Sequence, residues 1–362
     1  MAKLRWGVPS TAGIGRLVIE AARAADHAEF VAVASRDADR ARAFAGELGL
    51  EAGFGSYEEL LASSQVDAVY VPLPVAMHTE WTVKALEAGK HVLCEKPLAT
   101  SAADAARCFD AAETAGRRCV EGLMYRHHPQ TILARKLVAG GAIGRLAHVR
   151  AALSVSVPPD DIRRSPELGG SALGDLGCYC ASAIRLFAGE PERVWATQAR
   201  DGEGGVDLRL AATLRLPADV LAQFDVALDL TRRDELELVG TEGRLTVPDP
   251  WLCRATNLEL SRDRSGRAHP RRPRRRPGSY RPRPRRLPDR ARHGLGGPRR
   301  RRGAAVRPLR RDRPGDRAPG PPPLGRAWHA GRPDQVVACL ADRLVTKEPT
   351  GGAAPQARSV PA

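Results

Sequence analysis

The first third of the chain alternates short apolar runs with amphipathic stretches. Apolar or alternating runs predict strands at residues 3–8, 30–35, 66–73 and 91–94. Apolar residues at helical spacing predict helices at 14–25 and 79–88, and Ser101 with Asp104 opens a further helix. Strands that alternate with helices in this way indicate a parallel, doubly wound sheet. We therefore expect an α/β protein whose residues 1–123 form a Rossmann-type domain.

The pattern changes from about Leu146, where strand-like segments follow one another with period two. These segments lie at 148–157, 193–199, 206–216, 220–230 and 235–239. We expect one helix among them, at 175–188. The pattern predicts an α+β domain with an open-faced, mostly antiparallel sheet, formed by residues 124–261 and about 321–362.

Charge is concentrated in one segment. Residues 261–326 hold 24 of the 57 basic residues and 4 of the 42 acidic ones, although the whole chain has a net charge of +15. Residues 262–320 mix Arg with Pro and Gly and have almost no apolar periodicity, so we expect no packed structure there. Because GC-rich codons read out of frame give this composition, we favour a frameshift in the gene.

A basic arm for nucleic acid is the second interpretation of the arginine-rich segment. It is disfavoured because Tyr280 is the segment's one aromatic residue. After about residue 321 a helical pattern returns, with Val336, Leu340 and Leu344 on one face, as a compensating shift would produce. We therefore expect no nucleic-acid partner.

Other features exclude several classes of protein. The seven cysteines form no CxxC pair, so reduced thiols are expected. No run of eighteen apolar residues occurs, which indicates a soluble cytoplasmic protein without a membrane partner. Neither an HExxH motif nor a histidine cluster with ligand spacing is present, and we expect no metal.

A nucleotide-binding turn follows the first predicted strand. Ser10, Ala12 and Gly15 occupy the positions of a GxGxxG fingerprint, where small residues let backbone approach a pyrophosphate. Ser35 and Arg36 end the second strand, where an NAD site would place an acidic residue. They suit a 2′-phosphate, which Arg40 would reinforce, so NADP is favoured over NAD.

Two further motifs suggest acid–base chemistry. Lys96 directly follows the strand at 91–94 and so lies at the edge where such sheets bind ligands. Asp175 and Tyr179 are four residues apart, on one face of the predicted helix. A tyrosine needs a nearby cation to act as a base at neutral pH, and Lys96 is the candidate.

Four motifs occur together in one order: the turn at 10–15, Glu95-Lys96-Pro97, the segment 124–129 and Asp175-x-Gly177-x-Tyr179. In this combination the chain, over about residues 3–260, resembles the glucose-fructose oxidoreductase / inositol dehydrogenase-like (Gfo/Idh/MocA) family, close to the dimeric dihydrodiol dehydrogenase and NADP D-xylose 1-dehydrogenase branch. The resemblance implies hydride transfer between NADP and a carbinol carbon of a sugar or cyclic diol. It also implies a homo-oligomer formed through the open sheet face.

The resemblance assigns roles to individual residues. It implies that Lys96 and Tyr179 are catalytic, that Asp175 positions the substrate, and that Arg126 and His128 belong to the substrate pocket. Together with the fingerprint it implies a dinucleotide site made of Gly7, Ser10, Thr11, Ala12, Gly13, Ile14, Ser35, Arg36, Arg40, Leu73, His78, Glu95 and Lys96.

Three residues depart from the family pattern. Val75 replaces an asparagine, which removes a cofactor hydrogen bond of about 1 kcal/mol. Pro9 stiffens the end of the first strand, and Gly174 replaces a larger apolar residue. An NADPH-dependent keto-sugar reductase and a catalytically impaired relative remain alternatives.

Overall fold

The computed structural model describes residues 3–254 and 257–262. Most of the arginine-rich segment, from residue 263 on, and the pattern expected after residue 321 lie outside the described residues. Arg262 itself is described and ends the last strand. Two sheets account for the described chain, and each is built from one of the two regions that the sequence pattern distinguishes.

The first sheet is six-stranded and parallel in all its pairings. Its order is β3-β2-β1-β4-β5-β6, with the strands β1 (Leu4–Val8), β2 (Ala28–Ala34), β3 (Ala52–Phe54), β4 (Ala68–Val71), β5 (His91–Cys94) and β6 (Cys119–Glu121). The connecting helices are α1 (Gly13–Ala22), α2 (Ala38–Leu48), α3 (Tyr57–Ala62), α4 (His78–Glu87) and α5 (Ala102–Thr114). The predicted doubly wound sheet is confirmed.

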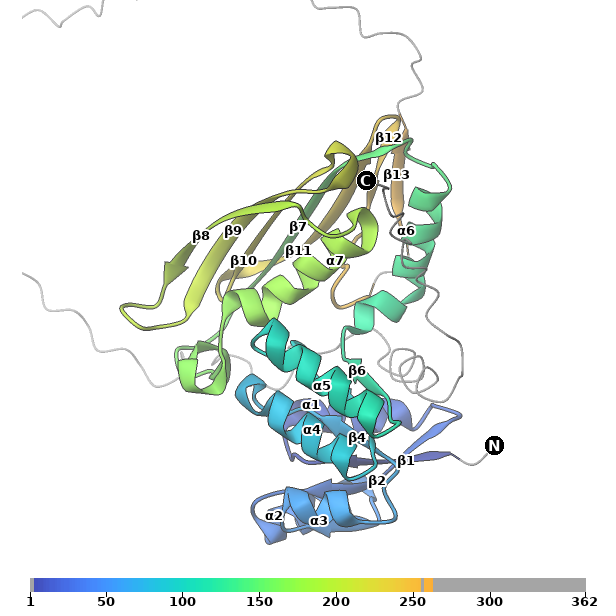
Figure 1. Cartoon of the computed structure of the whole chain (residues 1–362), viewed down its shortest axis with the longest axis vertical. Coiled ribbons are helices and arrows are strands. Elements are labelled where there is room, and N and C mark those ends of the chain that lie inside the picture. Colours follow the sequence, from blue (N-terminus) through green and yellow to red (C-terminus); the bar gives the residue numbers. More distant parts are fainter. Residues whose placement is uncertain (1–2, 255–256, 263–362) are drawn as a thin grey trace, which may run out of the picture. The chain divides into compact units, whose positions relative to one another are not determined.

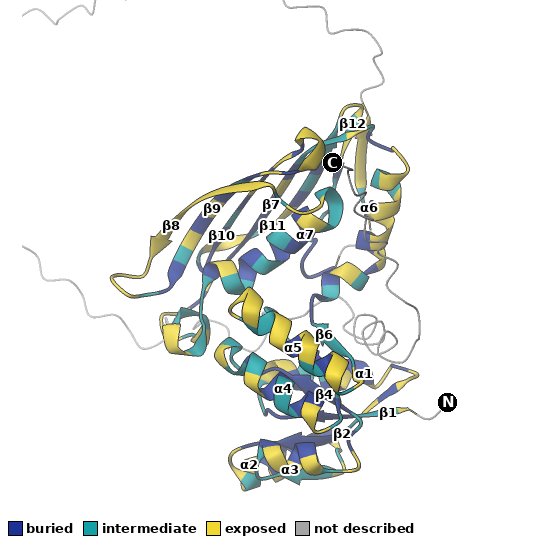
Figure 2. Cartoon of the chain, in the orientation of Figure 1, coloured by how far each residue is buried: buried dark blue, intermediate teal, exposed yellow. Residues whose placement is uncertain are grey.

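Burial explains why these segments form a parallel sheet. β4 is buried along its whole length, and β5 is buried from Val92 to Cys94. Such strands read as continuous apolar runs because helices cover both faces of the sheet. In Figure 2 the centre of the sheet around β4 is dark, whereas α4 and α5 turn exposed residues outward. The short strands β3 and β6, together with α2, were absent from the sequence expectation.

The second sheet has seven strands in the order β13-β12-β11-β7-β10-β9-β8 (Figure 1). They are β7 (Leu146–Ser156), β8 (Arg193–Arg200), β9 (Asp207–Arg215), β10 (Leu221–Ala227), β11 (Asp229–Gly240), β12 (Gly243–Thr246) and β13 (Glu259–Arg262). Every pairing is antiparallel except that of β10 with β7. This confirms the mostly antiparallel second sheet, whereas the domain boundary at residue 123 stays a prediction.

Several elements of the second region differ from the expectation. β11 begins six residues before the predicted start at Glu235. The sequence pattern did not indicate this earlier start, because the first half of the strand is polar and shows no apolar alternation. β12 and β13 were not predicted, and neither was α6 (Pro129–Ala139). The predicted helix at 175–188 is divided into a π-helical turn, Leu173–Gly177, and α7 (Cys178–Ala188).

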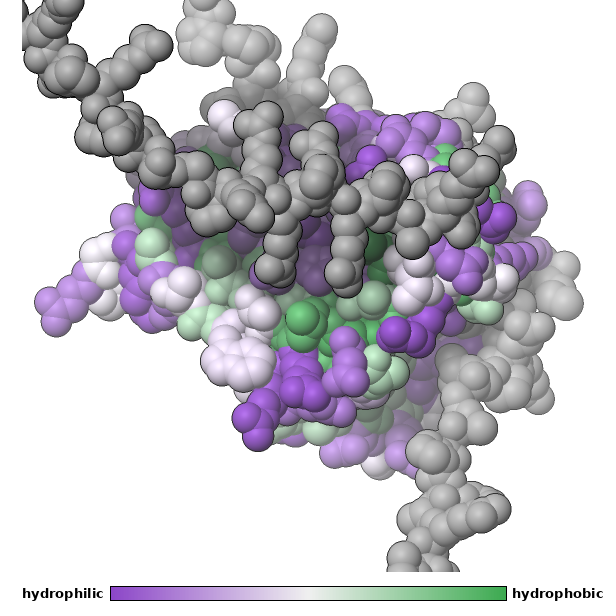
Figure 3. All heavy atoms as spheres, turned by 90° about the horizontal axis from the view of Figure 1, so that it is seen from above, coloured by the Kyte–Doolittle hydropathy of each residue, from purple (hydrophilic) through white to green (hydrophobic). Residues whose placement is uncertain are grey.

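One face of the second sheet packs against α7 (Figure 1). On β9 the buried residues Leu210, Ala212 and Leu214 belong to the same core cluster as Ala183 and Ile184 of α7. The alternate residues of β9 point the other way: Arg209, Ala211 and Arg215 are exposed, and Thr213 is partly exposed. The edge strand β8 is exposed at all of its positions. Seen from above, hydrophilic side chains surround a smaller apolar area (Figure 3).

Candidate active site

The strand order of the first sheet reverses between β1 and β4, and α1 begins beside this point. Ala12 precedes α1 and supplies no side-chain cap to its first turn. Ser10 Oγ accepts a hydrogen bond of 3.0 Å from the Ala12 amide and shapes the turn. A Cβ atom added at Gly13 would meet nothing within 4 Å. This uncapped, open helix start can receive a phosphate group.

Two exposed cations follow β2: Arg36 in the loop and Arg40 in the first turn of α2. Asp37, the nearest acidic residue, uses its carboxylate to cap α2, accepting from the amides of Asp39 and Arg40 at 3.0 Å each. Ser35 is buried, and its Oγ accepts from the Asp37 amide at 3.2 Å. The carboxylate of Asp37 is therefore directed at the helix start, and the Asp39 carboxylate pairs with Arg42.

Lys96 follows β5, and its side chain contacts the π-helical turn Leu173–Gly177 that precedes α7. Its Nζ donates to Asp175 Oδ1 at 2.5 Å and to the Asp175 carbonyl oxygen at 2.9 Å. The same ammonium lies 5.2 Å from the centre of the Tyr179 ring. Burial is the largest single effect on the Lys96 pKa and lowers it. The charge and hydrogen bond of Asp175, together with Tyr179 and Cys178, raise it by more, so the net pKa is raised. The structure thus brings the three predicted catalytic residues together.

Tyr179 is 8% exposed, and burial raises the pKa of its hydroxyl above the ordinary value. Lys96 acts in the expected direction and lowers this pKa, but its effect is the smaller one. The effect of Lys96 thus has the expected direction, but burial outweighs it, and in the protein by itself the phenol keeps its proton. A change of surroundings is needed before it can act as a base.

Two aromatic residues that sequence reasoning missed hold the Tyr179 ring. Its centre lies 6.0 Å from that of Tyr125 and 5.9 Å from that of Trp251. Tyr125 donates to Ser182 Oγ at 2.8 Å, and Trp251 Nε1 donates to the Ala152 carbonyl at 2.9 Å. Trp251 lies outside the predicted strands and motifs, so no periodicity indicated its role.

Hydrogen bonds of Glu95 and His78 connect β4 and the segment that follows it to the segment that follows β5, on either side of Lys96. Tyr70 on β4, also unforeseen, donates to Glu95 Oε1 at 2.7 Å. The ring nitrogens of His78 lie 2.7 Å from the Pro97 carbonyl and 2.8 Å from the Leu73 carbonyl. His78 and Leu73 are thus structural neighbours of the predicted cofactor edge.

Arg126 and His128, the two residues assigned to the substrate pocket, lie immediately before α6. His128 Nδ1 accepts from the Gln130 amide at 3.3 Å and so caps α6, and burial lowers the His128 pKa. Arg126 lies exposed in the turn before α6. Within the described part of the chain, neither side chain has a hydrogen bond or ion pair with Asp175 or Tyr179. Their assignment to the substrate pocket stays a prediction.

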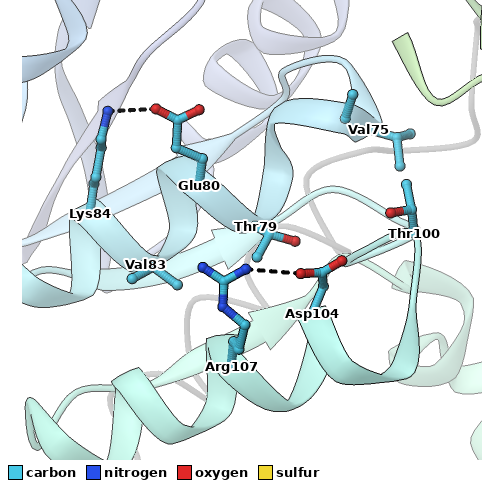
Figure 4. Close-up of a pocket in the computed structure, with 9 residues that line it drawn as sticks. Val75, Thr79, Glu80, Val83, Lys84, Thr100, Asp104 and Arg107 are labelled. Atoms are coloured by element: carbon cyan, nitrogen blue, oxygen red, sulfur yellow. Dashed lines mark hydrogen bonds and ion pairs between the residues drawn. The ribbon is translucent and has the colours of Figure 1, made fainter. Parts of the chain in front are cut away.

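A separate cavity of about 320 Å³ lies between α4 and α5 (Figure 4). Two ion pairs line it, Lys84 with Glu80 at 2.6 Å and Arg107 with Asp104 at 3.0 Å. Val75 lines it too, but Lys96 and Tyr179 do not. This cavity is therefore separate from the cluster of Lys96, Asp175 and Tyr179.

The described residues contain neither a metal-binding cluster nor a helix that could span a membrane. They contain no group of three or more His, Cys, Asp or Glu residues arranged to hold a metal ion. No helix in residues 3–254 and 257–262 is long and apolar enough to cross a membrane.

Models of one protein family match both regions of the chain. The model described as an oxidoreductase family with an NAD-binding Rossmann fold matches residues 4–123. The model of the GFO/IDH/MocA C-terminal domain matches residues 131–246.

Curated relatives and solved structures agree with these matches. D-xylose 1-dehydrogenase (NADP(+)) 2 of Haloferax volcanii is 43% identical over 67% of this chain and 75% of its own length. Trans-1,2-dihydrobenzene-1,2-diol dehydrogenase of Xenopus tropicalis is 32% identical over 68% and 76%. A 3-ketoreductase from Actinomadura kijaniata, solved with TDP-benzene and NADP, has a TM-score of 0.65 and 33% identity, covering 72% of this chain and 82% of that one.

Proposed function

The chain belongs to the Gfo/Idh/MocA oxidoreductase family, and from this premise we propose that it transfers hydride between NADP and a carbinol carbon of a sugar or cyclic diol. Relatives of both kinds, a D-xylose dehydrogenase and a dihydrodiol dehydrogenase, support this substrate class. The observation that carries the proposal is the cluster of Lys96, Asp175 and Tyr179 at the carboxyl edge of the parallel sheet.

The residues present fit NADP. The uncapped start of α1 and the open space at Gly13 suit the pyrophosphate, with Thr11 and Ile14 beside it. Arg36, with Arg40 one turn on, would hold the 2′-phosphate, since the nearby carboxylate of Asp37 is engaged in a helix cap. When bound, the dinucleotide supplies or accepts hydride at C4 of its nicotinamide.

Tyr179 is the residue that takes or gives the proton of the substrate hydroxyl. Its phenol is protonated in the protein alone, so it is ready to donate a proton in the reducing direction. In the oxidising direction a cation must stabilise the phenolate, and the Lys96 ammonium is close enough to the ring to do so. Asp175 fixes that ammonium and is available to a substrate hydroxyl.

A keto-sugar reductase is the second candidate function. It is favoured by the 33% identity to the solved 3-ketoreductase, which binds a TDP ligand and NADP. The chemistry at Tyr179 and Lys96 is the same in reverse, so the two functions differ in substrate and direction. A catalytically impaired relative is the third candidate, because the arginine-rich composition begins where the second sheet ends.

We also propose a homo-oligomer, formed through the face of the second sheet opposite α7, in the cytoplasm. A hollow of about 510 Å³ on this sheet is lined by Trp195, Thr213 and Gln223, among others. Trp195 is 55% exposed, which is unusual for so large an apolar side chain. Light scattering of the wild type and of Trp195→Glu tests this: a fall in mass in the variant is expected, and equal masses contradict it.

The experiment that tests the function is a pair of cofactor titrations followed by a substrate assay. We expect NADPH fluorescence to report tighter binding than NADH, and NADP to be reduced when D-xylose, D-glucose or a cyclic diol is added. Reduction of a keto sugar by NADPH, without oxidation of these substrates, would select the second function. Absence of binding by either cofactor would select the impaired relative.

A further inference from the structure

Asp175 is contacted by cations from two sides. Its Oδ1 accepts from Lys96 Nζ at 2.5 Å, and its Oδ2 lies 3.9 Å from Arg163 Nη1. Arg163 stands in a single turn of 3-10 helix, Ile162–Arg164, between β7 and the π-helical turn that carries Asp175. None of the motifs in the sequence includes it. The carboxylate is thus shared between a lysine of the first region and an arginine of the second.

The Arg163 side chain is held in place by Asp161. Nε and Nη2 of Arg163 donate to the two oxygens of Asp161 at 2.8 Å each. The Arg163 amide donates to the same carboxylate at 3.0 Å. A bidentate pair of this kind fixes both the position and the plane of the guanidinium group. Asp161, Arg163, Asp175 and Lys96 therefore form a chain of alternating charges.

The four charged side chains are partly buried, which strengthens the electrostatic interactions between them. The side chain of Arg163 is 26% exposed, and those of Asp161, Asp175 and Lys96 are 18%, 17% and 15% exposed. Charges shielded to this extent interact more strongly than the exposed ion pairs elsewhere on the chain. Removal of one charge therefore changes the electrostatic energy of the other three.

The backbone around Arg163 is folded tightly. A Cβ atom on Gly170 would lie 2.5 Å from the Arg163 carbonyl oxygen and 2.8 Å from that of Ser165. Gly169 has a φ of +78°, a conformation that side chains rarely adopt. The two glycines thus let the segment return across the base of Arg163 before the π-helical turn begins. The close packing thus fixes the backbone of Arg163, and Asp161 fixes its guanidinium.

We propose, on the basis of the function above, that Arg163 is a positioning residue that divides the Asp175 carboxylate between two cations and so leaves the Lys96 charge available to Tyr179. Without Arg163 the carboxylate would neutralise Lys96 more completely. The tyrosine would then be harder to deprotonate, because a cation is what stabilises its phenolate. Arg163 touches neither Tyr179 nor the reacting atoms, so it acts through Asp175.

Other ionisable groups also face this cluster. Tyr179 is influenced by Glu95 and Cys178 as well as by Lys96 and Asp175. Glu121 faces Cys178, and Tyr70 faces Glu95. These groups are unchanged in the Arg163, Asp161 and Arg164 variants, so a difference between two of those variants reports the altered residue.

The test is the pH dependence of kcat/KM for substrate oxidation by the full-length enzyme. In Arg163→Gln we expect kcat to fall by about tenfold or more. The ascending limb of the plot of kcat/KM against pH should move to higher pH by at least about half a unit. Arg163→Lys keeps the charge, so its limb should stay at the wild-type position. Asp161→Asn removes a negative charge, so its limb should move to lower pH. NADPH affinity should not change in any of the three.

Arg164→Gln is the matched control. Arg164 is the next residue on the same turn and pairs with Asp201 at 2.7 Å, away from Asp175. Its variant should keep the wild-type limb and kcat. Arg163→Gln is replaced as the test variant if circular dichroism and NADPH binding show that it does not fold. The proposal is then tested by whether the ascending limb keeps its wild-type position in Arg163→Lys and moves to lower pH in Asp161→Asn.

Several outcomes overturn the proposal in distinguishable ways. A wild-type enzyme without turnover overturns the proposed function and the role of Arg163 with it. Full turnover in Lys96→Met leaves the function standing but overturns the role of Lys96, and with it that of Arg163. Normal wild-type turnover with limbs that coincide in the Arg163 and Asp161 variants overturns the role of Arg163 alone. Equal displacement of the limbs in Arg163→Lys and Arg163→Gln overturns it as well, since the charge would then have no effect.

Discussion

Tyr125 donates a hydrogen bond to Ser182 across 2.8 Å, joining the segment that leaves the first sheet to the middle of α7. Tyr125 is fully buried, and Ser182 is 8% exposed. The bond lies beside Tyr179, whose ring contacts that of Tyr125. The position of the proposed proton donor thus depends on a polar contact inside an apolar core.

This contact predicts an asymmetric loss of stability. Ser182→Ala leaves the buried Tyr125 hydroxyl without its partner, which should lower the free energy of unfolding by about 1–3 kcal/mol. Tyr125→Phe should cost less, because it leaves one serine acceptor without a donor while the serine proton can still be donated to a backbone carbonyl of the helix. Urea denaturation measures both. The double variant should cost less than the sum of the two; additive costs would show that the bond contributes nothing.

Lys96→Met and Tyr179→Phe should each lower kcat by about two orders of magnitude or more, because general acid–base catalysis supplies a factor of this size. NADPH affinity, measured by fluorescence titration, should stay nearly unchanged in Tyr179→Phe. A Tyr179→Phe enzyme with wild-type kcat would exclude the phenol from the mechanism.

Arg36 should determine the choice of cofactor. Hydrogen bonds to charged groups contribute about 1.5–3 kcal/mol, so Arg36→Ala should weaken NADPH binding by about 10- to 100-fold and leave NADH binding unchanged. Arg42→Ala is the control, because Arg42 pairs with Asp39 at 2.5 Å on the same helix. If both cofactors are weakened equally, Arg36 does not contact the 2′-phosphate.

His128 should make the protein sensitive to acid. Burial lowers the pKa of His128 in the folded chain, so the unfolded chain binds more protons as the pH falls through about 6.5. Stability is therefore lost from that pH downward, until the folded-state pKa is passed. His128→Asn keeps a capping oxygen without the titration. Its urea midpoint should match the wild type at pH 8 and exceed it at pH 5.

A second variant separates the titration of His128 from its role as a helix cap. His128→Ala removes the acceptor of the Gln130 amide, so it should be destabilised at both pH values by about 1 kcal/mol. Identical pH profiles in the wild type and His128→Asn would contradict the role of titration.

The central elements of the first sheet and the catalytic cluster could be predicted from sequence for a physical reason. β5 was predicted with its observed bounds, because a strand buried on both sides is a plain apolar run. The position of Lys96 follows from that strand, since the carboxyl ends of parallel strands share one edge. α2 was missed although Asp37 and the helical spacing of Ala41, Phe44 and Leu48 mark it.

The parts that could not be predicted depend on contacts between distant residues. The first half of β11 is polar, and its strand conformation comes from pairing with β7. Arg163 meets Asp175 only because the intervening loop folds back on itself. The high pKa of Tyr179 depends on how deeply packing buries the ring, and the Asp175-to-Tyr179 spacing carries no such information.

The pairing of β7 has a consequence for the order in which the molecule is built. β7 lies between β10 and β11, and His148 pairs with Leu221 and Val239, both far ahead along the chain. During synthesis the first sheet can close while β7 still lacks both neighbours, since pairings of long sequence separation form slowly. α7 then has no completed surface on which to pack. The catalytic centre is therefore among the last parts of the described chain to assemble, and recovery of activity on refolding should lag behind recovery of helical signal.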